Sequence, residues 1–394
     1  MESDEDLPQV LPVPTPTTAA IRHKCSACFK QYKKKEHLVE HMKTSYHSIH
    51  QPKCGVCQKY CKCFESLREH IHGPLSKASC SRIFAERGCI LCLELCDGVD
   101  ALINHKDVCQ LPAPAPIGMM NLPCVEPQIT ILSSNTANST KRGYEAIAID
   151  CEMVGGGSNG SLDLCARVCL VDEDEKILFH TYVLPQIPVT DYRFEVTGIK
   201  EEHLRDAMPL KEVQEQIQQI LYNGESVEDL RWGGGQPKVL VGHNLDCDLD
   251  CLRMNYPDHL LRDTAKYHPL MKTNLVSHSL KYLTKTYLGY DIQIGVHDPY
   301  EDCVSVMRLY KRMRSQNHWM GGIGWSLPDQ DNLCSTTVFD SWKSKELEKL
   351  TPDELFRMSR SNYTCWCLDS RQAFEDGWNT TPRVEAKISN SWKE

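Results

Sequence analysis

The sequence lacks any apolar run that approaches the roughly 18 residues of a membrane-spanning helix. Its N-terminus also lacks the basic segment of a signal peptide, because the charged residues there are Glu2, Asp4, Glu5 and Asp6. We therefore expect no membrane contact and a cytosolic or nuclear compartment, where disulfides are rare. The paired cysteines early in the chain are accordingly expected to bind metal rather than to form bridges.

Aromatic residues make up only 8% of the 394 residues, but 41% are hydrophobic and 25% are charged, which is a globular composition. The length predicts roughly two domains. Residues 21–109 carry 15 Lys and Arg against 9 Asp and Glu, whereas residues 110–394 carry 29 against 40. A basic, cysteine-rich N-terminal segment followed by an acidic segment favours a polyanion-binding module joined to a second domain. A surplus of only six positive charges can also serve solubility alone.

Composition divides the chain into five parts. Residues 1–20 are acidic and then Pro/Thr-rich, which predicts a disordered lead, and residues 110–142 are Pro/Ser-rich, which predicts a linker. Between them, residues 21–109 hold three cysteine–histidine repeats. Residues 143–313 form the expected second domain. In the tail, 314–394, six of the seven tryptophans lie at or after Trp319, and Thr351-Pro352-Asp353-Glu354 predicts the start of a short helix.

The second domain alternates strand-like and helix-like segments, so we expect an α/β mixed sheet. Apolar patterning predicts strands over 144–153, 165–171, 176–184 and 239–241, and helices over 210–221, 246–254, 279–288 and 300–312.

The cysteine–histidine repeats have zinc-finger spacing. Finger one is of the Cys2His2 type and finger three of the Cys2HisCys type, and their ligands are Cys25, Cys28, His41 and His47, and Cys89, Cys92, His105 and Cys109. A fold of this size cannot be held together by burial alone, so zinc supplies the folding energy.

Finger two repeats the pattern with Cys54, Cys57 and His70. Its fourth ligand is ambiguous. His72 comes sooner than the usual spacing of three to five residues, and Cys80 comes late, so Cys80 is favoured. About three zinc ions are expected in all.

The three finger helices lack arginine at the positions that contact bases in DNA-reading fingers. We therefore expect shape- or backbone-level RNA binding, or protein contact, rather than sequence-specific DNA reading. That the fingers only stabilise the N-terminal region remains an alternative.

Two carboxylates stand at the end of the first predicted strand, in Ile149-Asp150-Cys151-Glu152. Alternate residues of a strand share a face, so Asp150 and Glu152 project together. Two buried carboxylates on one face are costly unless a cation neutralises them.

Three more polar residues follow other expected elements. Asp248 lies in the helix after the strand at 239–241, with Asp246 and Asp250 as competitors. His297 lies in a loop, and Asp302 lies in the first turn of the next helix. Together with Asp150 and Glu152 they form a set suited to two-metal phosphodiester hydrolysis, because Mg²⁺ prefers carboxylate oxygens and histidine can accept a proton from water.

The order Asp-x-Glu, Gly-His-x4-Asp and His-x4-Asp resembles the DEDD exonucleases of the histidine subtype, which have a ribonuclease H-like fold. The surrounding sequence is similar to the RNA exonuclease 4-like branch, which includes interferon-stimulated and apoptosis-enhancing exonucleases. The likeness spans about residues 144–313, through the segments 148–155, 189–193, 197–199, 262–264, 279–281, 301–302 and 307–310.

The resemblance implies 3′→5′ hydrolysis that releases nucleoside 5′-monophosphates. It implies Asp150, Glu152, Asp248 and Asp302 as ligands of two Mg²⁺ or Mn²⁺ ions and His297 as general base. It further implies that Met153 and Arg193 contact the terminal nucleotide and its 2′-hydroxyl, which favours RNA. Met153 as a plain core residue remains an alternative.

Several features depart from this branch: the insertion at 223–237, the zinc fingers and the tail. The insertion precedes the Asp248 motif and could cover the active-site cleft that the resemblance implies, which would restrict access of the substrate. The glycine-rich segment 155–160 is read as a flexible turn. Our leading hypothesis is a nuclear or nucleolar exoribonuclease whose fingers recruit RNA. The alternatives are a DNA exonuclease, or a non-catalytic adaptor that contacts nucleic acid or proteins through its fingers or tail.

Overall fold

A computed structural model describes residues 22–25, 30–44, 51–74, 76–117, 145–224, 237–316 and 365–370. The chain divides into two compact units. The first comprises Met1–Ile49 and Thr336–Ser361, and the second comprises His50–Ser335 and Asn362–Glu394. Most of the insertion expected at 223–237, the helix expected from Thr351, and the proposed ligands Cys28 and His47 lie outside the described residues.

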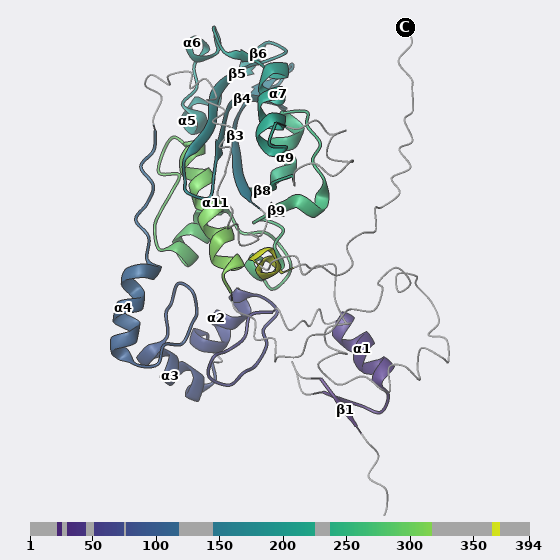
Figure 1. Cartoon of the computed structure of the whole chain (residues 1–394), viewed down its shortest axis with the longest axis vertical. Helices are drawn as coiled ribbons and strands as arrows, with labels where there is room; N and C mark the ends of the chain where they lie inside the picture. The colour runs from purple at the N-terminus through teal and green to yellow at the C-terminus, as the bar shows by residue number, and fades with distance from the viewer. Residues whose placement is uncertain are drawn as a thin grey trace, which may run out of the picture. The chain divides into compact units, whose positions relative to one another are not determined.

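The described part of the first unit is a small ββα arrangement that corresponds to finger one (Figure 1). Strands β1 (His23–Lys24) and β2 (Gln31–Tyr32) pair in antiparallel fashion and precede helix α1 (Lys35–Thr44). The ring of Tyr32 stacks on that of His41 at 5.0 Å, and Leu38 is buried. These contacts form a small apolar centre between the hairpin and α1.

A seven-stranded mixed sheet forms the centre of the second unit. Its path runs β7-β5-β4-β3-β8-β9, with β6 paired to β3. Neighbours β3, β4 and β5 are antiparallel, whereas β3, β8 and β9 are parallel. The strands are β3 (Ala146–Gly156), β4 (Leu162–Val171), β5 (Ile177–Leu184), β6 (Val189–Asp191), β7 (Met208–Pro209), β8 (Val239–Gly242) and β9 (Leu261–Asp263). The expected α/β mixed sheet is thus confirmed.

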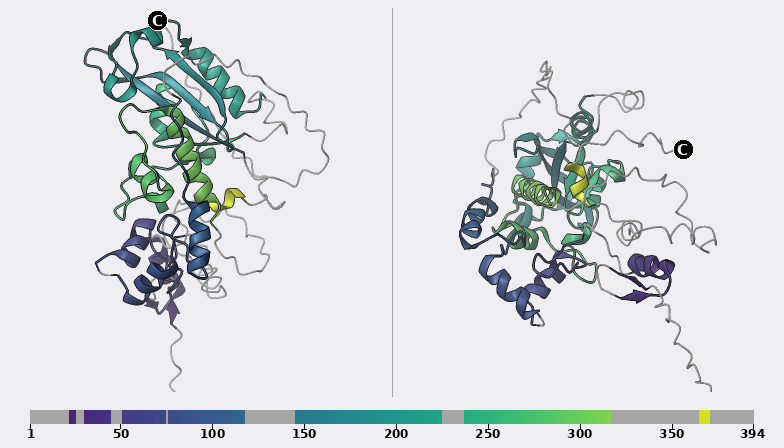
Figure 2. Two further views of the ribbon diagram at one scale, coloured as in Figure 1. Left: turned by 90° about the vertical axis from the view of Figure 1, so that its left-hand side faces the viewer. Right: turned by 60° about the horizontal axis from the view of Figure 1, so that its bottom comes forward.

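Helices cover both faces of this sheet, which is why β3, β4 and β8 are nearly continuous apolar runs (Figures 1 and 2). Helix α11 (Pro299–Arg314) packs along β3, β4 and β8, and most of its residues are buried. Helix α9 (Leu245–Cys251) contacts β3 and β4, and α7 (Leu210–Leu221) contacts β5 and β7. Two short helices, α5 (Phe194–Thr197) and α6 (Glu201–Leu204), follow β6.

The helix expected over 279–288 is instead two shorter elements. Helix α10 (Leu280–Leu283) passes into a π-helical turn, η3 (Thr284–Leu288), and Gly289, with φ of 89°, ends it. The Thr284 hydroxyl donates to the Lys281 carbonyl at 3.0 Å, a local side-chain bond of the kind that disturbs helix regularity. The remaining short turns are η1 (Asp258–Leu260) and η2 (His268–Leu270).

Fingers two and three belong to the second unit, with α2 (Phe64–His72), α3 (Ala78–Arg87) and α4 (Val99–Cys109) as their helices. A short piece of the tail, η5 (Trp366–Ser370), belongs to it as well. Trp366 stacks on Tyr267 at 3.8 Å, and Asp369 accepts two hydrogen bonds of 2.8 Å from Arg262. None of the helices in the described ranges is long and apolar enough to cross a membrane.

Candidate active site

The carboxylates of β3 project toward the face of the sheet that α11 covers. Because side chains alternate along a strand, Ile147 and Ile149 are buried on one face of the sheet, and Asp150 and Glu152 lie together on the opposite face. Burial, and then the charge of Asp302, raise the pKa of Glu152 to about 8. The same two causes, followed by Asp248 and Glu152, raise the pKa of Asp150 well above its usual range. The carboxylates are therefore close enough to oppose one another's ionisation.

Asp248 approaches the same strand from α9. It is buried, and its Oδ1 accepts a hydrogen bond of 2.9 Å from the backbone N–H of Cys151. Burial raises the pKa of Asp248 well above its usual range. One hydrogen bond thus joins the third carboxylate to the residue between the first two.

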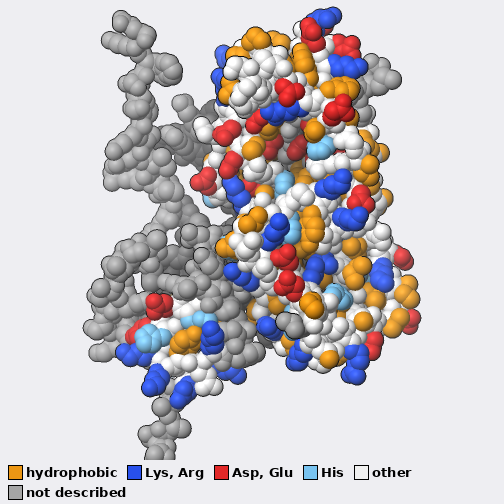
Figure 3. Space-filling view, turned by 180° about the vertical axis from the view of Figure 1, so that it is seen from behind, with side chains coloured by type: hydrophobic (Ala, Val, Ile, Leu, Met, Phe, Trp, Pro, Cys, Tyr) orange, Lys and Arg blue, Asp and Glu red, His pale blue; other side chains and the backbone are white. Residues whose placement is uncertain are grey.

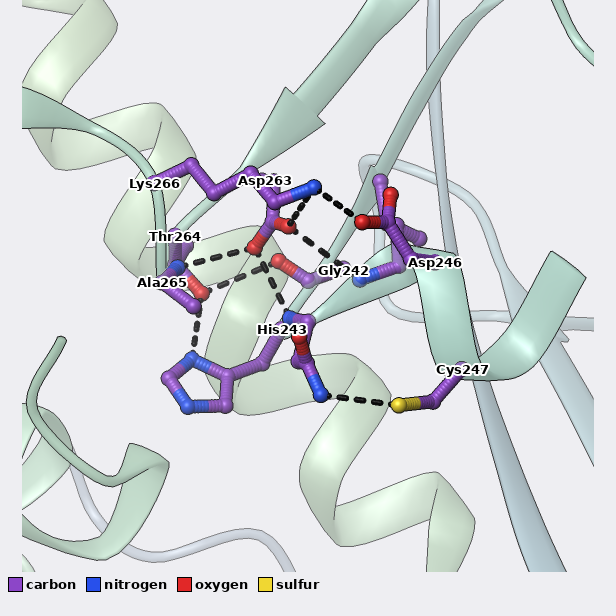
Figure 4. Close-up of polar contacts among 10 residues, drawn as sticks. Gly242, His243, Asp246, Cys247, Asp263, Thr264, Ala265 and Lys266 are labelled. Carbon is purple, nitrogen blue, oxygen red and sulfur yellow. Dashed lines mark hydrogen bonds and ion pairs between the residues drawn. The ribbon is translucent and has the colours of Figure 1, made fainter. Parts of the chain in front are cut away.

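The side chain of the N-cap residue, Asn244, makes no capping hydrogen bond at the N-terminus of α9. A carboxylate from the neighbouring strand β9 accepts hydrogen bonds there instead (Figure 4). Asp263, at the end of β9, accepts backbone hydrogen bonds from Asn244, Leu245 and Ala265 at 2.8, 3.2 and 2.9 Å. Asn244 adopts a left-handed conformation, with φ of 65°, at the sharp turn from β8. Because Asp248 lies in this helix, Asp263 positions it. The resemblance included Asp263 in a motif but gave it no role.

Asp302 lies in the first turn of α11, which is capped by Asp298 through the N–H groups of Tyr300 and Glu301. Gln293 donates to Asp302 Oδ2 at 2.9 Å, whereas the buried Oδ1 has no hydrogen-bond partner among the described residues. Burial raises the pKa of Asp302 to about 7. A buried carboxylate oxygen with no donor is what a cation ligand requires.

His297 lies in the loop before α11, and its backbone N–H donates to the Val196 carbonyl of α5 at 2.7 Å. Ligand atoms of Glu152, His297 and Asp302 all lie within 4.8 Å of one another. Burial, and then the nearby charge of Lys281, lower the pKa of His297. The imidazole is therefore neutral near pH 7, the state in which it can accept a proton.

A buried arginine lies behind the acidic group and was missed by the sequence reasoning. Arg167, with 1% of its surface exposed, donates from Nε to His180 at 2.9 Å and pairs with Asp298 at 3.3 Å. Its charge also lowers the pKa of Glu152, against the larger effect of burial. The signal was present in the sequence, because a charged residue inside an apolar strand requires a partner.

The two expected substrate contacts have different surroundings in the structure. Met153 is partly buried and packs against the apolar core. Arg193, with φ of 49°, pairs with Asp163 at 2.7 Å and donates to the Gly160 carbonyl at 3.1 Å. Arg193 is therefore held by Gly160 of the turn that follows β3 and by Asp163 near the start of β4.

The four carboxylates fit a site for divalent cations. They present oxygen ligands, and burial raises the pKa of each of them. The charges of neighbouring carboxylates raise the pKa further at Asp150 and Glu152, and Asp302 Oδ1 has no hydrogen-bond partner among the described residues. The structure brings ligand atoms of Glu152, His297 and Asp302 within 4.8 Å of one another, and Asp248 contacts the neighbouring Cys151 backbone. The charges of Asp302, Asp248 and Glu152 raise the pKa of Asp150.

Two clusters of thiols and histidine occur in fingers two and three, each with its ligand atoms within 4.8 Å of one another. Finger two groups Cys54, Cys57, His70 and Cys80, and finger three groups Cys89, Cys92, His105 and Cys109. Each is a four-ligand set of the kind that zinc binds in structural sites. His72 instead packs edge-on against Phe84 at 5.2 Å.

Comparison with known proteins finds exonucleases among the similar proteins. The Exonuclease family model matches residues 147–310. RNA exonuclease 4 of Mycosarcoma maydis is 30% identical over 274 residues, covering 67% of this chain and 68% of that protein. RNA exonuclease 4 of Cryptococcus neoformans is 36% identical over 176 residues, covering 44% of this chain but only 40% of that protein.

Human interferon-stimulated 20 kDa exonuclease-like 2 is 35% identical over 179 residues, covering 44% of this chain and 47% of that protein. Among solved structures, the Saccharomyces cerevisiae Pan2 pseudoubiquitin hydrolase-RNA exonuclease module is 24% identical with a TM-score of 0.36. That match covers 45% of this chain and 29% of the Pan2 chain.

Proposed function

The chain belongs to the RNA exonuclease 4 family, and on that premise we propose that it is a divalent-metal-dependent 3′→5′ exoribonuclease that releases nucleoside 5′-monophosphates. The observation that carries the proposal is the convergence of four buried carboxylates and a histidine of lowered pKa around the middle of β3. Buried acids of this kind are unfavourable in a folded protein unless a cation binds them.

In this proposal Asp150, Glu152, Asp248 and Asp302 hold two Mg²⁺ or Mn²⁺ ions. Ions held by these residues would supply positive charge that stabilises the charge developing on the phosphodiester during hydrolysis. The protein's own part is to hold the carboxylates in place and to exclude excess water. His297, neutral near pH 7, accepts the proton of the attacking water through an imidazole nitrogen.

The terminal nucleotide is proposed to lie between Met153 and Arg193. In the structure the Arg193 guanidinium pairs with Asp163, whose side chain is half exposed. A 2′-hydroxyl offers this guanidinium an acceptor in addition to Asp163 and the Gly160 carbonyl, which is the proposed source of preference for RNA over DNA. Fingers two and three are proposed to bind one zinc ion each through their four-ligand clusters.

The test is digestion of matched single-stranded RNA and DNA in Mg²⁺ by the full chain and by two variants. Asp150→Asn should abolish nucleotide release, because the neutral amide cannot replace a carboxylate ligand. Asp250→Asn is the matched control, since Asp250 is an exposed acid of α9 outside the acidic group. Equal digestion of DNA would favour the DNA exonuclease, and no digestion by the unaltered chain would favour a non-catalytic adaptor.

A further inference from the structure

Finger two is packed into the exonuclease body rather than tethered beside it. The Phe64 ring of α2 contacts the Tyr287 ring of η3, with centroids 5.7 Å apart, and both side chains are buried. The Arg68 guanidinium lies 4.9 Å from the same Tyr287 ring and donates to the Thr286 carbonyl at 2.9 Å. These buried contacts fix the finger relative to the active site.

A second set of contacts joins the start of α2 to the loop before α10. Glu65 accepts from the Thr273 backbone N–H at 2.7 Å, and Lys62 Nζ donates to the Thr273 carbonyl at 3.3 Å. His278, farther along this loop, places Nε2 3.7 Å from a Glu65 oxygen. We call this contact, between Lys62 and Glu65 of finger two and Thr273 and His278 of the exonuclease domain, the seam, and Lys62 has a defined position in it.

Aromatic and basic side chains continue from this seam to the active site. The His278 ring stacks on Tyr282 of α10, with centroids 4.0 Å apart and an interplanar angle of 12°. Tyr282 is 38% exposed, so part of its ring remains open to a ligand. The adjacent Lys281 is exposed and donates to the Gln293 carbonyl at 3.0 Å, and Gln293 donates in turn to Asp302.

We propose that this surface, the strand track made of Lys281, Tyr282 and Lys62, binds the nucleotides that precede the 3′ end of a single-stranded RNA. The inference rests on the proposed function and assigns finger two a part in the substrate path. Cations that follow the phosphates, combined with an aromatic ring on which a base can stack, form the usual platform for single strands. Figure 3 shows acidic side chains within a hollow, and Lys, Arg and His side chains on the surface beside it.

The track also explains why a finger without base-reading arginines is fixed at this place. Stacking on Tyr282 and attraction of phosphates by Lys62 and Lys281 do not depend on the base, which suits an enzyme that must advance through any sequence. Glu65, the acid at the seam, accepts a hydrogen bond from the backbone N–H of Thr273, and its carboxylate faces the finger–loop contact.

The experiment compares kcat/KM for a dinucleotide with that for an RNA of about 16 nucleotides, the upper site size of a common single-strand-binding domain. Tyr282→Ala should lower the ratio of long to short substrate by about five- to tenfold, at the lower end of base–aromatic stacking. Tyr282→Phe, which keeps the ring, should retain most of that ratio.

Lys62→Ala should lower the slope of log affinity against log salt concentration for the longer RNA by about 0.7, the value for one phosphate contact on a single strand. Direct binding by fluorescence anisotropy, with Ca²⁺ in place of Mg²⁺, provides this slope without turnover. Lys211→Ala is the matched control, because Lys211 is an exposed lysine of α7 whose side chain is 86% exposed.

An unchanged ratio in Tyr282→Ala, or an equal loss on both substrates, would overturn the track while the exonuclease assignment stood. An unaltered chain that binds the longer RNA through Tyr282 and Lys62 but never shortens it would support the track and refute the proposed activity. Unchanged RNA binding in both variants would instead point to a protein ligand at this surface and would end the proposal.

Discussion

Replacing Asp263 by alanine should weaken the enzyme although this residue is not a proposed metal ligand. Its carboxylate accepts three backbone hydrogen bonds at the turn that begins α9, and its side chain is 8% exposed. Each such bond is worth roughly 1 kcal/mol, but water can replace the acceptor at the exposed Asn244. We therefore expect the free energy of unfolding to fall by about 2–3 kcal/mol.

The same change should reduce turnover more than it reduces RNA binding. Asp248 depends on the position of α9 for its 2.9 Å contact with the Cys151 N–H. A displacement of about 1 Å in such a group can lower kcat by roughly a hundredfold. The concentration of Mg²⁺ needed for half-maximal activity should rise as well, because Asp248 is a proposed ligand.

Asp263→Asn is the control of matched shape. Its remaining carbonyl oxygen can still accept from Asn244 and Ala265, which share Oδ1 in the structure, whereas the bond from Leu245 to Oδ2 is lost. This variant should lose about 1 kcal/mol of stability and keep most of its kcat. Urea denaturation and Mg²⁺ titration of kcat measure both effects. An alanine variant with unaltered unfolding midpoint, kcat and Mg²⁺ dependence would refute the positioning role of Asp263.

Further outcomes follow from the buried charges and the thiol clusters. Arg167→Met should lower the free energy of unfolding by about 3–5 kcal/mol, because the buried Asp298 carboxylate then lacks the arginine charge that it pairs with. A decrease below about 1 kcal/mol, measured by urea denaturation, would contradict this. Mg²⁺ binding at pH 7 should release protons, since the metal-free Glu152 and Asp302 have pKa values of about 8 and about 7 and the ion binds their ionised forms. Mg²⁺ affinity should accordingly rise with pH up to about 8. Binding enthalpies that do not change with the protonation enthalpy of the buffer would show that no protons are released and would contradict the prediction. Cys80→Ser should reduce bound zinc, measured by elemental analysis, by about one ion per chain, whereas His72→Ala should leave it unchanged.

Local pattern was sufficient for much of the exonuclease fold. The helix expected over 210–221 coincides with α7, because its apolar residues recur at helical spacing and nothing interrupts them. The mixed sheet followed from three strands in succession and then alternating strands and helices. The turn at Thr284 was missed, because one hydroxyl bond and Gly289 divide a segment whose apolar spacing is helical throughout.

The contacts that complete the site join residues far apart in sequence, which local pattern cannot reveal. Arg167 was visible as a charge in an apolar strand, but its partner Asp298 lies 131 residues away. Asp263 stood in a quoted motif, yet its role depends on the turn from β8 to α9. The packing of finger two against η3 was not anticipated, because finger spacing predicts a self-contained fold and does not indicate what its helix packs against.

The central claim is tested most directly by identifying the first product released from a 3′-labelled RNA in the presence of Mg²⁺. We expect the label to leave first as a single nucleoside 5′-monophosphate and a 5′-labelled copy to shorten one nucleotide at a time, and we expect Asp248→Asn to abolish both. Release of labelled fragments longer than one nucleotide, or full activity in Asp248→Asn, would contradict the claim.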